Sequence, residues 1–239
     1  MTLLQSKDLF MRFGGVTAIG GVSFSMSEGS VHCLVGPNGA GKSTFFKMVT
    51  GQLSPSSGSV SFRGRNITGL RSSEIVNLGI GIKTQTPQLF DDVSVEENIW
   101  LGARRLAHGD PRVRVRQLLA DLELTSIKSR VVGTLPHGLR QRTEIAAVLA
   151  SDPKLILLDE PAAGMSDSDV EQIAELILRL KPSHSFLVVE HDMRFIRRIA
   201  DTVTVFHQGK VFMEGSCDRV LSDSGVRDIY LGKGLIGNA

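Results

Sequence analysis

Residues 36–44 read GPNGAGKST, and this stretch constrains the fold more than any other part of the chain. It matches the pattern G-x-x-x-x-G-K-[ST], with Gly36, Gly41, Lys42 and Ser43 at the defined positions. The strand-like segment VHCLV precedes it, and the helix-like segment STFFKMV follows. In that order, backbone N–H groups gather at a helix N-terminus and bind phosphate, Lys42 reaches the β- and γ-phosphates, and the Ser43 hydroxyl binds Mg²⁺. The segment therefore predicts a site for a nucleoside triphosphate.

Apolar runs alternate with helical patterns through most of the chain. The segments KLILLDE and SFLVVEHD are continuous apolar strands, and the helical segment DSDVEQIAELILRL separates them. Strands of this kind are typical of a mostly parallel sheet that is buried on both faces. The segment FMRFGGVTAIGG, with two Gly-Gly pairs, predicts a hairpin or a loop, and TVTVFHQGKVFMEG predicts a hairpin that turns at Gln208-Gly209. We therefore predict an α/β core.

The middle of the chain has a different pattern, because helices replace strands there. The segments VSVEENIWLGARRL, PRVRVRQLLADLEL and LRQRTEIAAVLA each read as a helix. We interpret residues 88–150 as a helical subdomain that is inserted into a core made of residues 1–87 and 151–239. The insert starts near Thr86-Pro87 and ends near Asp152-Pro153. On this interpretation, residues 1–239 form a single domain.

The composition is that of an ordinary globular protein, with 41% hydrophobic and 22% charged residues and a net charge of +2. The two cysteines, Cys33 and Cys217, are too few and too far apart for a disulfide framework, and they predict buried thiols in a reducing compartment. No apolar run reaches the roughly 18–20 residues of a membrane span. The first segment, MTLLQSKDLFMRF, lacks the order of a signal peptide. We expect a cytoplasmic location.

Two strand ends carry side chains that suit phosphate chemistry. The strand LILL ends at Asp159 and Glu160, and the strand FLVV ends at Glu190 and His191. Asp159 would hold a water of the Mg²⁺ shell, and Glu160 would polarise the attacking water. His191 is either an ordinary histidine or a partner of the γ-phosphate. Gln85 lies where strands give way to helices, and it is either a plain loop residue or a ligand of Mg²⁺ and of water.

Together these motifs resemble those of the ATP-binding subunits of ABC transporters. GPNGAGKST, a glutamine at 85, a glycine-bearing helix start at 135–139, LLDEP at 157–161 and His191 occur in that family's order. The resemblance covers essentially the whole chain. It implies an α/β fold in which a P-loop NTPase (RecA-like) core carries an antiparallel β subdomain and an inserted α-helical subdomain. It also implies ATP and Mg²⁺ as cofactors, with ATP held between two subunits that face head to tail.

The resemblance assigns roles residue by residue. It implies that ATP is bound by Phe13, Gly36, Pro37, Asn38, Gly39, Ala40, Gly41, Lys42, Ser43, Thr44, Gln85 and Asp159. It implies that Mg²⁺ is bound by Ser43, Gln85 and Asp159, and that catalysis depends on Lys42, Glu160 and His191. Phe13 would stack on adenine, whereas Phe10 suits the core better.

The family's signature, LSGGQ, falls on five residues that keep it only in part. These are Leu135, Pro136, His137, Gly138 and Leu139. The family signature presents a helix N-terminus to the γ-phosphate in the opposite subunit. Here Pro136 removes both the serine hydroxyl and a backbone donor, and only Leu135 and Gly138 are retained. The segment PAAGMSD after Glu160 also departs from the family's S-A-L-D.

Three segments, PAAGM, RTEIA and GIKTQTPQLFDDVSVEENI, resemble one branch of the family, the importers of branched-chain amino acids, amides and urea. That branch implies transmembrane permease subunits, a second and non-identical ATP-binding subunit and, indirectly, a substrate-binding protein. It places the chain at the cytoplasmic face of the membrane, bound through the permease. In such an asymmetric pair, the signature of this chain and the P-loop of the partner form one ATP site together. A weak signature in this chain therefore damages only that site.

Two alternatives stay open. ATPases of lipopolysaccharide exporters share the short helical insert and an ending like DIYLGKG, although their signature is usually intact. A regulatory ABC subunit without turnover would tolerate Pro136, but Glu160 and His191 favour hydrolysis. ABC proteins that act on ribosomes or DNA generally carry two ATP-binding domains or a long coiled coil, and 239 residues do not accommodate either.

Arginines crowd the predicted insert, which bears on possible partners. They are Arg104, Arg105, Arg112, Arg114 and Arg116. The last three fall on the polar side of one helix, which favours a solvated face over contact with anionic lipid or the permease. Apart from Trp100, no aromatic side chain nearby would stack on bases, so we expect no nucleic-acid partner.

Overall fold

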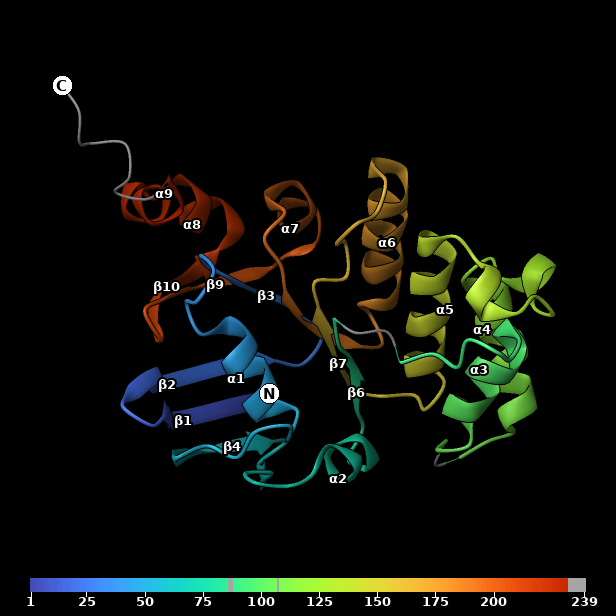
Figure 1. Ribbon diagram of the computed structural model, residues 1–239, viewed down its shortest axis with the longest axis horizontal. Coiled ribbons are helices and arrows are strands. Elements are labelled where there is room, and N and C mark those ends of the chain that lie inside the picture. Colours follow the sequence, from blue (N-terminus) through green and yellow to red (C-terminus); the bar gives the residue numbers. More distant parts are fainter. Residues whose placement is uncertain (86–87, 107, 232–239) are drawn as a thin grey trace.

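The computed structural model describes residues 1–85, 88–106 and 108–231, and Figure 1 shows how its elements are arranged. The strands are β1 (Thr2–Phe13), β2 (Val16–Ser27), β3 (Val31–Val35), β4 (Ser57–Phe62), β5 (Arg65–Asn66), β6 (Ile80–Lys83), β7 (Leu155–Asp159), β8 (Ser185–Val189), β9 (Thr202–His207) and β10 (Lys210–Ser216). The α-helices are α1 (Lys42–Val49), α2 (Ser72–Asn77), α3 (Val95–Ala103), α4 (Pro111–Asp121), α5 (His137–Leu149), α6 (Asp167–Leu180), α7 (Met193–Ile199), α8 (Cys217–Ser222) and α9 (Ser224–Leu231). Two short 3₁₀ helices are η1 (Thr125–Ile127) and η2 (Val132–Thr134).

The central sheet has six strands in the order β10-β9-β3-β8-β7-β6. The strands from β9 to β6 are parallel, and β10 is antiparallel to β9. Every residue of β3 and β8 is buried, as expected for strands covered on both faces. The predicted parallel sheet is confirmed, and so is the hairpin at Gln208-Gly209, where both residues have positive φ angles of 50° and 75°.

A second, antiparallel sheet covers one face of the central sheet. Its order is β2-β1-β4-β5, and Phe13 pairs with Val16 across the predicted glycine hairpin. An apolar cluster joins this sheet, α1 and the central sheet through residues such as Leu9, Phe45 and Leu157. Helix α1 therefore lies between the two sheets, as Figure 1 shows. The predicted antiparallel β portion of the core is confirmed.

Helices cover the other face of the central sheet. Helix α6 begins at Asp167, as predicted, because the Ser166 hydroxyl accepts a hydrogen bond from the Asp169 N–H. Its apolar residues Ile173 and Ile177 join one cluster with residues of α5, α7 and the central sheet. This second cluster forms the core on the side opposite the antiparallel sheet.

The helices α3, α4 and α5 form the group at the right of Figure 1. Helices α3 and α5 touch closely at Gly102, where a Cβ atom would lie 2.1 Å from the Ala147 carbonyl oxygen. The predicted start of the insert, Thr86-Pro87, lies outside the described residues, whereas its predicted end falls between α5 and β7. The division of the chain into a core and an insert at residues 87 and 150 therefore stays a prediction.

Both cysteines are buried and unpaired, which confirms the prediction for Cys33 and Cys217. Burial raises the pKa of each thiol, so neither is a reactive thiolate at neutral pH. Within the described ranges, no helix is long and apolar enough to cross a membrane.

Candidate active site

The loop from β3 to α1 has the backbone geometry that its glycines allow. Gly36, Gly39 and Gly41 have φ angles of 145°, 77° and 107°. A Cβ atom at Gly36 would lie 2.3 Å from the Phe206 carbonyl oxygen, so a larger residue there would clash with the backbone of β9. Helix α1 begins directly after Gly41, and no side chain caps its N-terminus. Its first N–H groups can therefore bind an anion.

Lys42 lies folded against this loop. Its Nζ atom donates hydrogen bonds to the carbonyl oxygens of Gly36 at 2.6 Å and of Pro37 at 3.1 Å. Burial lowers the pKa of Lys42, and the nearby charges of Glu160 and Asp159 oppose this shift. The residues Asn38, Gly39, Ala40, Gly41, Lys42, Ser43, Thr44, Ala18 and Glu160 line a cavity of about 150 Å³. The structure thus places the loop and Glu160 around one space.

Asp159 and Glu160 follow each other at the carboxyl end of β7 but have different surroundings. Burial, assisted by the charge of Glu160, raises the pKa of Asp159 to about 6, although Lys83 and other lysines act in the opposite direction. Glu160 has a positive φ of 49°, a conformation that costs non-glycine residues of order 1–3 kcal/mol and is common at functional sites. Its N–H donates to the Val189 carbonyl oxygen at 2.9 Å, which ties the turn to β8.

Two predicted site residues converge on the Glu160 carboxylate. The Gln85 Nε2 atom donates a hydrogen bond to Glu160 Oε2 at 2.9 Å. The His191 Nδ1 atom lies 3.8 Å from Glu160 Oε1 and 3.5 Å from Glu190 Oε2. Gln85 comes from the segment after β6, and His191 from the segment after β8. The ends of β6, β7 and β8 therefore bring these three side chains together.

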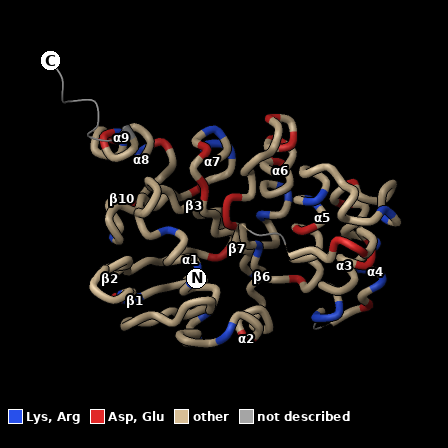
Figure 2. The backbone as a smooth tube through the Cα atoms, in the orientation of Figure 1, with Lys and Arg blue, Asp and Glu red and all other residues tan. Residues whose placement is uncertain are grey.

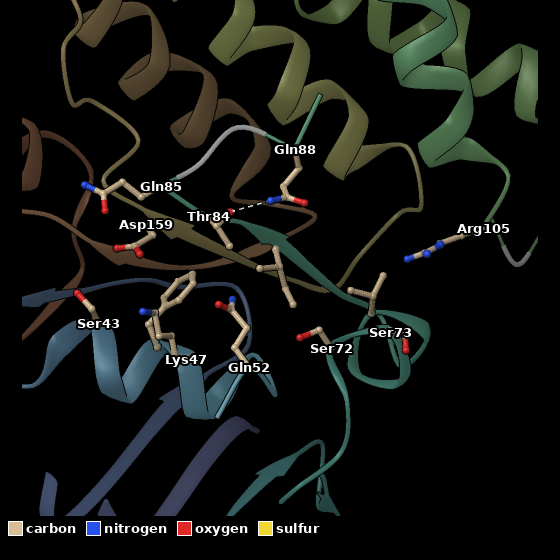
Figure 3. A pocket seen from close by; sticks show the side chains of 13 residues that line it. Ser43, Lys47, Gln52, Ser72, Ser73, Thr84, Gln85, Gln88, Arg105 and Asp159 are labelled. Carbon is tan, nitrogen blue, oxygen red and sulfur yellow. Dashed lines mark hydrogen bonds between the residues drawn. The ribbon is translucent and has the colours of Figure 1, made fainter. Parts of the chain in front are cut away.

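The three residues predicted to bind Mg²⁺ line one large cavity of about 810 Å³. Figure 3 shows Ser43, Gln85 and Asp159 at one end of this cavity. A hydroxyl, an amide and a carboxylate offer the oxygen donors that Mg²⁺ prefers, with phosphate oxygens completing its shell. Among the described residues, no group of three His, Cys, Asp or Glu side chains suits a metal ion. The donor set therefore fits a hard cation shared with a nucleotide.

Glu190 has a structural role that its position at a strand end does not reveal from sequence alone. Its side chain is 1% exposed. Glu190 Oε1 accepts a hydrogen bond from the Ala162 N–H at 3.0 Å, and Oε2 accepts bonds from the N–H groups of His191 at 2.7 Å and Asp192 at 3.3 Å. The buried carboxylate thus holds both the loop after Glu160 and the segment that carries His191. The sequence feature that could have identified Glu190 as a site residue is its position, as an acidic residue, at the end of a buried apolar strand.

Phe13 does not lie beside the other residues that were predicted to bind ATP. It lies at the end of β1, its side chain is 47% exposed, and it lines neither of the two cavities described above. Ala18, from the adjacent strand β2, does line the smaller cavity. Phe10 instead lies beneath Gly21, where a Cβ atom would approach its ring at 3.1 Å. The stacking role of Phe13 stays a prediction.

The five signature residues lie at the start of α5, apart from the P-loop cavities of the same chain. Leu135 is buried, and Pro136 directly precedes the helix without a side-chain cap. The His137 Nε2 atom lies 3.1 Å from the Ala163 carbonyl oxygen. A Cβ atom at Gly138 would lie 2.5 Å from Asp169 Oδ1. The helix start therefore packs against the loop that follows Glu160, and Leu139 packs on the core.

Known proteins are similar to this chain over nearly its whole length. The family described as ABC transporter matches residues 19–163. The high-affinity branched-chain amino acid transport ATP-binding protein BraF of Pseudomonas aeruginosa is 31% identical, with 97% of this chain and 98% of BraF covered. The lipopolysaccharide export system ATP-binding protein LptB of Acidithiobacillus ferridurans is 35% identical, with 96% and 97% covered. A crystal structure of the ADP conformation of an ATP-binding cassette of an ABC transporter has a TM-score of 0.89 at 31% identity, with 97% and 99% covered.

Proposed function

Since this chain belongs to the ABC transporter family of ATP-binding cassette ATPases, we propose that it binds and hydrolyses ATP to power an importer of branched-chain amino acids, amides or urea. The proposal that the chain hydrolyses ATP rests on one observation. Gln85 and His191 both approach the Glu160 carboxylate, beside the loop that contains Lys42. Relatives such as BraF, whose name includes branched-chain amino acid transport, support the cargo class.

The chain's own groups perform the reaction by position and charge. The N–H groups at the start of α1 and the Lys42 ammonium would bind the β- and γ-phosphates. Glu160 would orient the attacking water, and His191 would hydrogen-bond the γ-phosphate. Gln85 already contacts Glu160, so it can respond to the same water and phosphate. Mg²⁺, held by Ser43, Gln85 and Asp159, would neutralise charge on the phosphate oxygens when bound.

A groove beside the nucleotide site suits the permease partner. It has a volume of about 350 Å³ and lies between β6, α3 and α5. Phe90 and Leu101 line it, and they are 62% and 37% exposed, while Trp100 nearby is 41% exposed. Exposed apolar side chains around a groove are typical of a protein interface. Figure 2 shows acidic and basic residues interspersed over this region, so we propose the permease rather than anionic lipid as the partner.

We propose that the second ATP-binding subunit differs from this chain. Pro136 carries neither the hydroxyl nor the N–H of the family's signature serine, and His137 is held against the loop of Ala163. The signature serves an ATP molecule bound to the partner, so its loss would weaken only that site. The site on Lys42 and Glu160 would depend on an intact signature in a different chain. Through these partners the chain would lie at the membrane surface on the cytoplasmic side.

One observation favours a second candidate. The similarity to the lipopolysaccharide export protein LptB, at 35% identity, supports an ATPase of an exporter of that kind. The degenerate signature counts against this candidate, because the exporter family usually keeps it intact. A regulatory subunit without turnover is a third possibility, and the contacts around Glu160 count against it.

The test uses the assembled complex, purified from membranes through a tag on this chain. We expect two kinds of ATP-binding subunit and permease chains to copurify, and ATP hydrolysis that Glu160→Gln abolishes without loss of ATP binding. Reconstituted vesicles would then be supplied with labelled branched-chain amino acids, amides or urea. Uptake of none of these would contradict the import assignment, and turnover unaffected by E160Q would contradict the catalytic assignment.

A further inference from the structure

Lys83 and Glu144 form a buried ion pair, and neither residue is among those proposed to contact ATP or Mg²⁺. The Lys83 Nζ atom lies 3.5 Å from Glu144 Oε2, and their side chains are 1% and 3% exposed. Lys83 is the last residue of β6, and Glu144 lies within α5, the helix that begins at the signature. In the central sheet Lys83 pairs with Leu158, the residue before Asp159. The ion pair therefore joins the edge of the nucleotide site to the signature helix.

Glu144 also binds the backbone of Gln88. Its Oε1 atom accepts a hydrogen bond from the Gln88 N–H at 2.8 Å. Further along, Asn98 of α3 accepts a bond from the Phe90 N–H at 2.8 Å and donates one to the Phe90 carbonyl oxygen at 3.0 Å. Gln88 and Phe90 are thus bound to two helices, whereas Gln85 is bound to Glu160.

A second contact between β6 and α5 fixes their relative orientation. A Cβ atom at Gly81 would lie 2.6 Å from Val148 Cγ1, so α5 rests on the backbone of β6 at this point. Gly81 and Lys83 lie on the same face of β6, since side chains in a strand repeat every two residues. Glu144 and Val148 lie one turn apart on the same face of α5. Two contacts, one apolar and one ionic, therefore prevent α5 from rotating on β6.

We propose that the Lys83–Glu144 ion pair is a positioning device that couples the signature helix to the nucleotide site through the end of β6, beside Asp159. This inference rests on the proposed ATPase function and names residues that act on it indirectly. A buried ion pair is a poor source of stability, because desolvation of both charges offsets their attraction. A directional bond at this point does, however, link any displacement at the end of β6, where Lys83 lies beside the residue before Asp159, to α5. Neither residue needs to touch ATP for this role.

The test compares variants in the assembled complex. Lys83→Met with Glu144→Gln removes both charges and keeps a side-chain oxygen for the Gln88 N–H. We expect the affinity for ATP to change by less than about twofold and kcat to fall by about tenfold or more, because coupling and not binding is lost. A second charge-free pair, Lys83→Leu with Glu144→Gln, gives the same readout if the first double variant does not fold, because it also leaves no unpaired buried charge. A wild-type kcat in a folded variant would overturn the proposal.

A control breaks an exposed ion pair that does not join β6 to α5. Arg198→Met disrupts the pair of Arg198 with Glu171, which are 2.9 Å apart and join α7 to α6. We expect this variant to keep the wild-type kcat. A fall in kcat equal to that of K83M/E144Q would mean that any lost ion pair lowers turnover, and it would overturn a specific role for Lys83 and Glu144.

Hydrogen–deuterium exchange separates this proposal from the proposed function, because it needs no turnover. In a complex whose other ATP-binding subunit lacks its own P-loop lysine, the non-hydrolysable analogue AMP-PNP with Mg²⁺ binds at the P-loop of this chain, where it should slow exchange in residues 36–49 and in residues 137–149 of the wild-type chain. In K83M/E144Q only the first region should respond. An unchanged response of residues 137–149 would overturn the coupling. If the wild-type chain binds AMP-PNP and shows both responses but hydrolyses no ATP, the proposed function fails and the coupling stands.

Discussion

The P-loop and the signature helix are the two parts of this chain that would face ATP, and they differ in how well they keep the family pattern. In the P-loop, three glycines with positive φ and a bare helix start surround Lys42. At the start of α5, Pro136 carries no capping group, and His137 is held by the loop of Ala163. Two elements can diverge in this way when they serve different ATP molecules. The contrast supports our proposal that the chain is specialised for the P-loop half of one site and contributes a weak signature half to the other.

The largest effect should come from substitution of Glu160, the carboxylate proposed to orient water beside the P-loop. We expect Glu160→Gln to lower kcat for ATP by about a thousandfold, within the range typical of a general base. Steady-state phosphate release by the purified complex measures this. Glu175→Gln, on the exposed side of α6, serves as the control and should leave kcat unchanged. Comparable rates for the two variants would mean that Glu160 is not the base.

The second-largest effect should come from loss of the positively charged Lys42 side chain in the P-loop. Lys42→Ala removes a charged hydrogen-bond donor to phosphate, and we expect the affinity for ATP to fall by about 10- to 100-fold. Equilibrium binding of a fluorescent ATP analogue to the complex measures this. Lys47 lies one turn later on α1 and lines the larger cavity, so Lys47→Ala is a stringent comparison and should have a smaller effect. The reverse order would contradict the assignment of Lys42.

The raised pKa of Asp159 predicts a pH dependence of Mg²⁺ binding. Because burial raises this pKa to about 6, the anionic form is present above pH 6 and is lost as the pH falls through that value. We therefore expect the apparent Mg²⁺ affinity to fall by about tenfold between pH 7.5 and pH 5. Mg²⁺-dependent binding of ATP at both values measures it. Asp159→Asn cannot titrate and supplies the baseline due to ATP itself, so an equal dependence in both proteins would contradict the prediction.

The smallest effect should come from repair of the signature. We expect Pro136→Ser to change turnover at the site of Lys42 by less than about twofold, as for an uncoupled distant substitution. Phosphate release is measured in a complex whose other ATP-binding subunit lacks its own P-loop lysine. A tenfold rise would show that LPHGL limits this site, and it would contradict the proposed asymmetry.

The parts of the site that sequence predicts are those set by local pattern. The P-loop is one continuous motif, and the side chains after β7 and β8 must meet because parallel neighbouring strands end at the same edge. The hairpins at Gly14-Gly15 and Gln208-Gly209 follow equally from turn chemistry. For these features, the residue type and its place on an element are sufficient.

The parts that sequence does not predict depend on contacts between distant segments. Gln85 and Glu160 are hydrogen-bonded although 75 residues separate them. The burial of Lys83 with Glu144 is equally invisible, because each reads alone as an ordinary exposed charge. The contact of Gly138 with Asp169 depends on how α5 meets α6. Such pairings require the packed arrangement of helices, which no local pattern contains.

The hydrogen bonds of Glu190 have a consequence for how the chain can evolve. Its carboxylate holds the loop after Glu160 through the Ala162 N–H, a group that every residue except proline possesses. This bond therefore places no requirement on the side chain at position 162 while it holds the path of the loop. The loop also loses its conformational entropy during folding rather than when nucleotide arrives. Nucleotide binding then does not have to order the loop. In a Glu190 variant, the loop would lose this conformational entropy in every catalytic cycle.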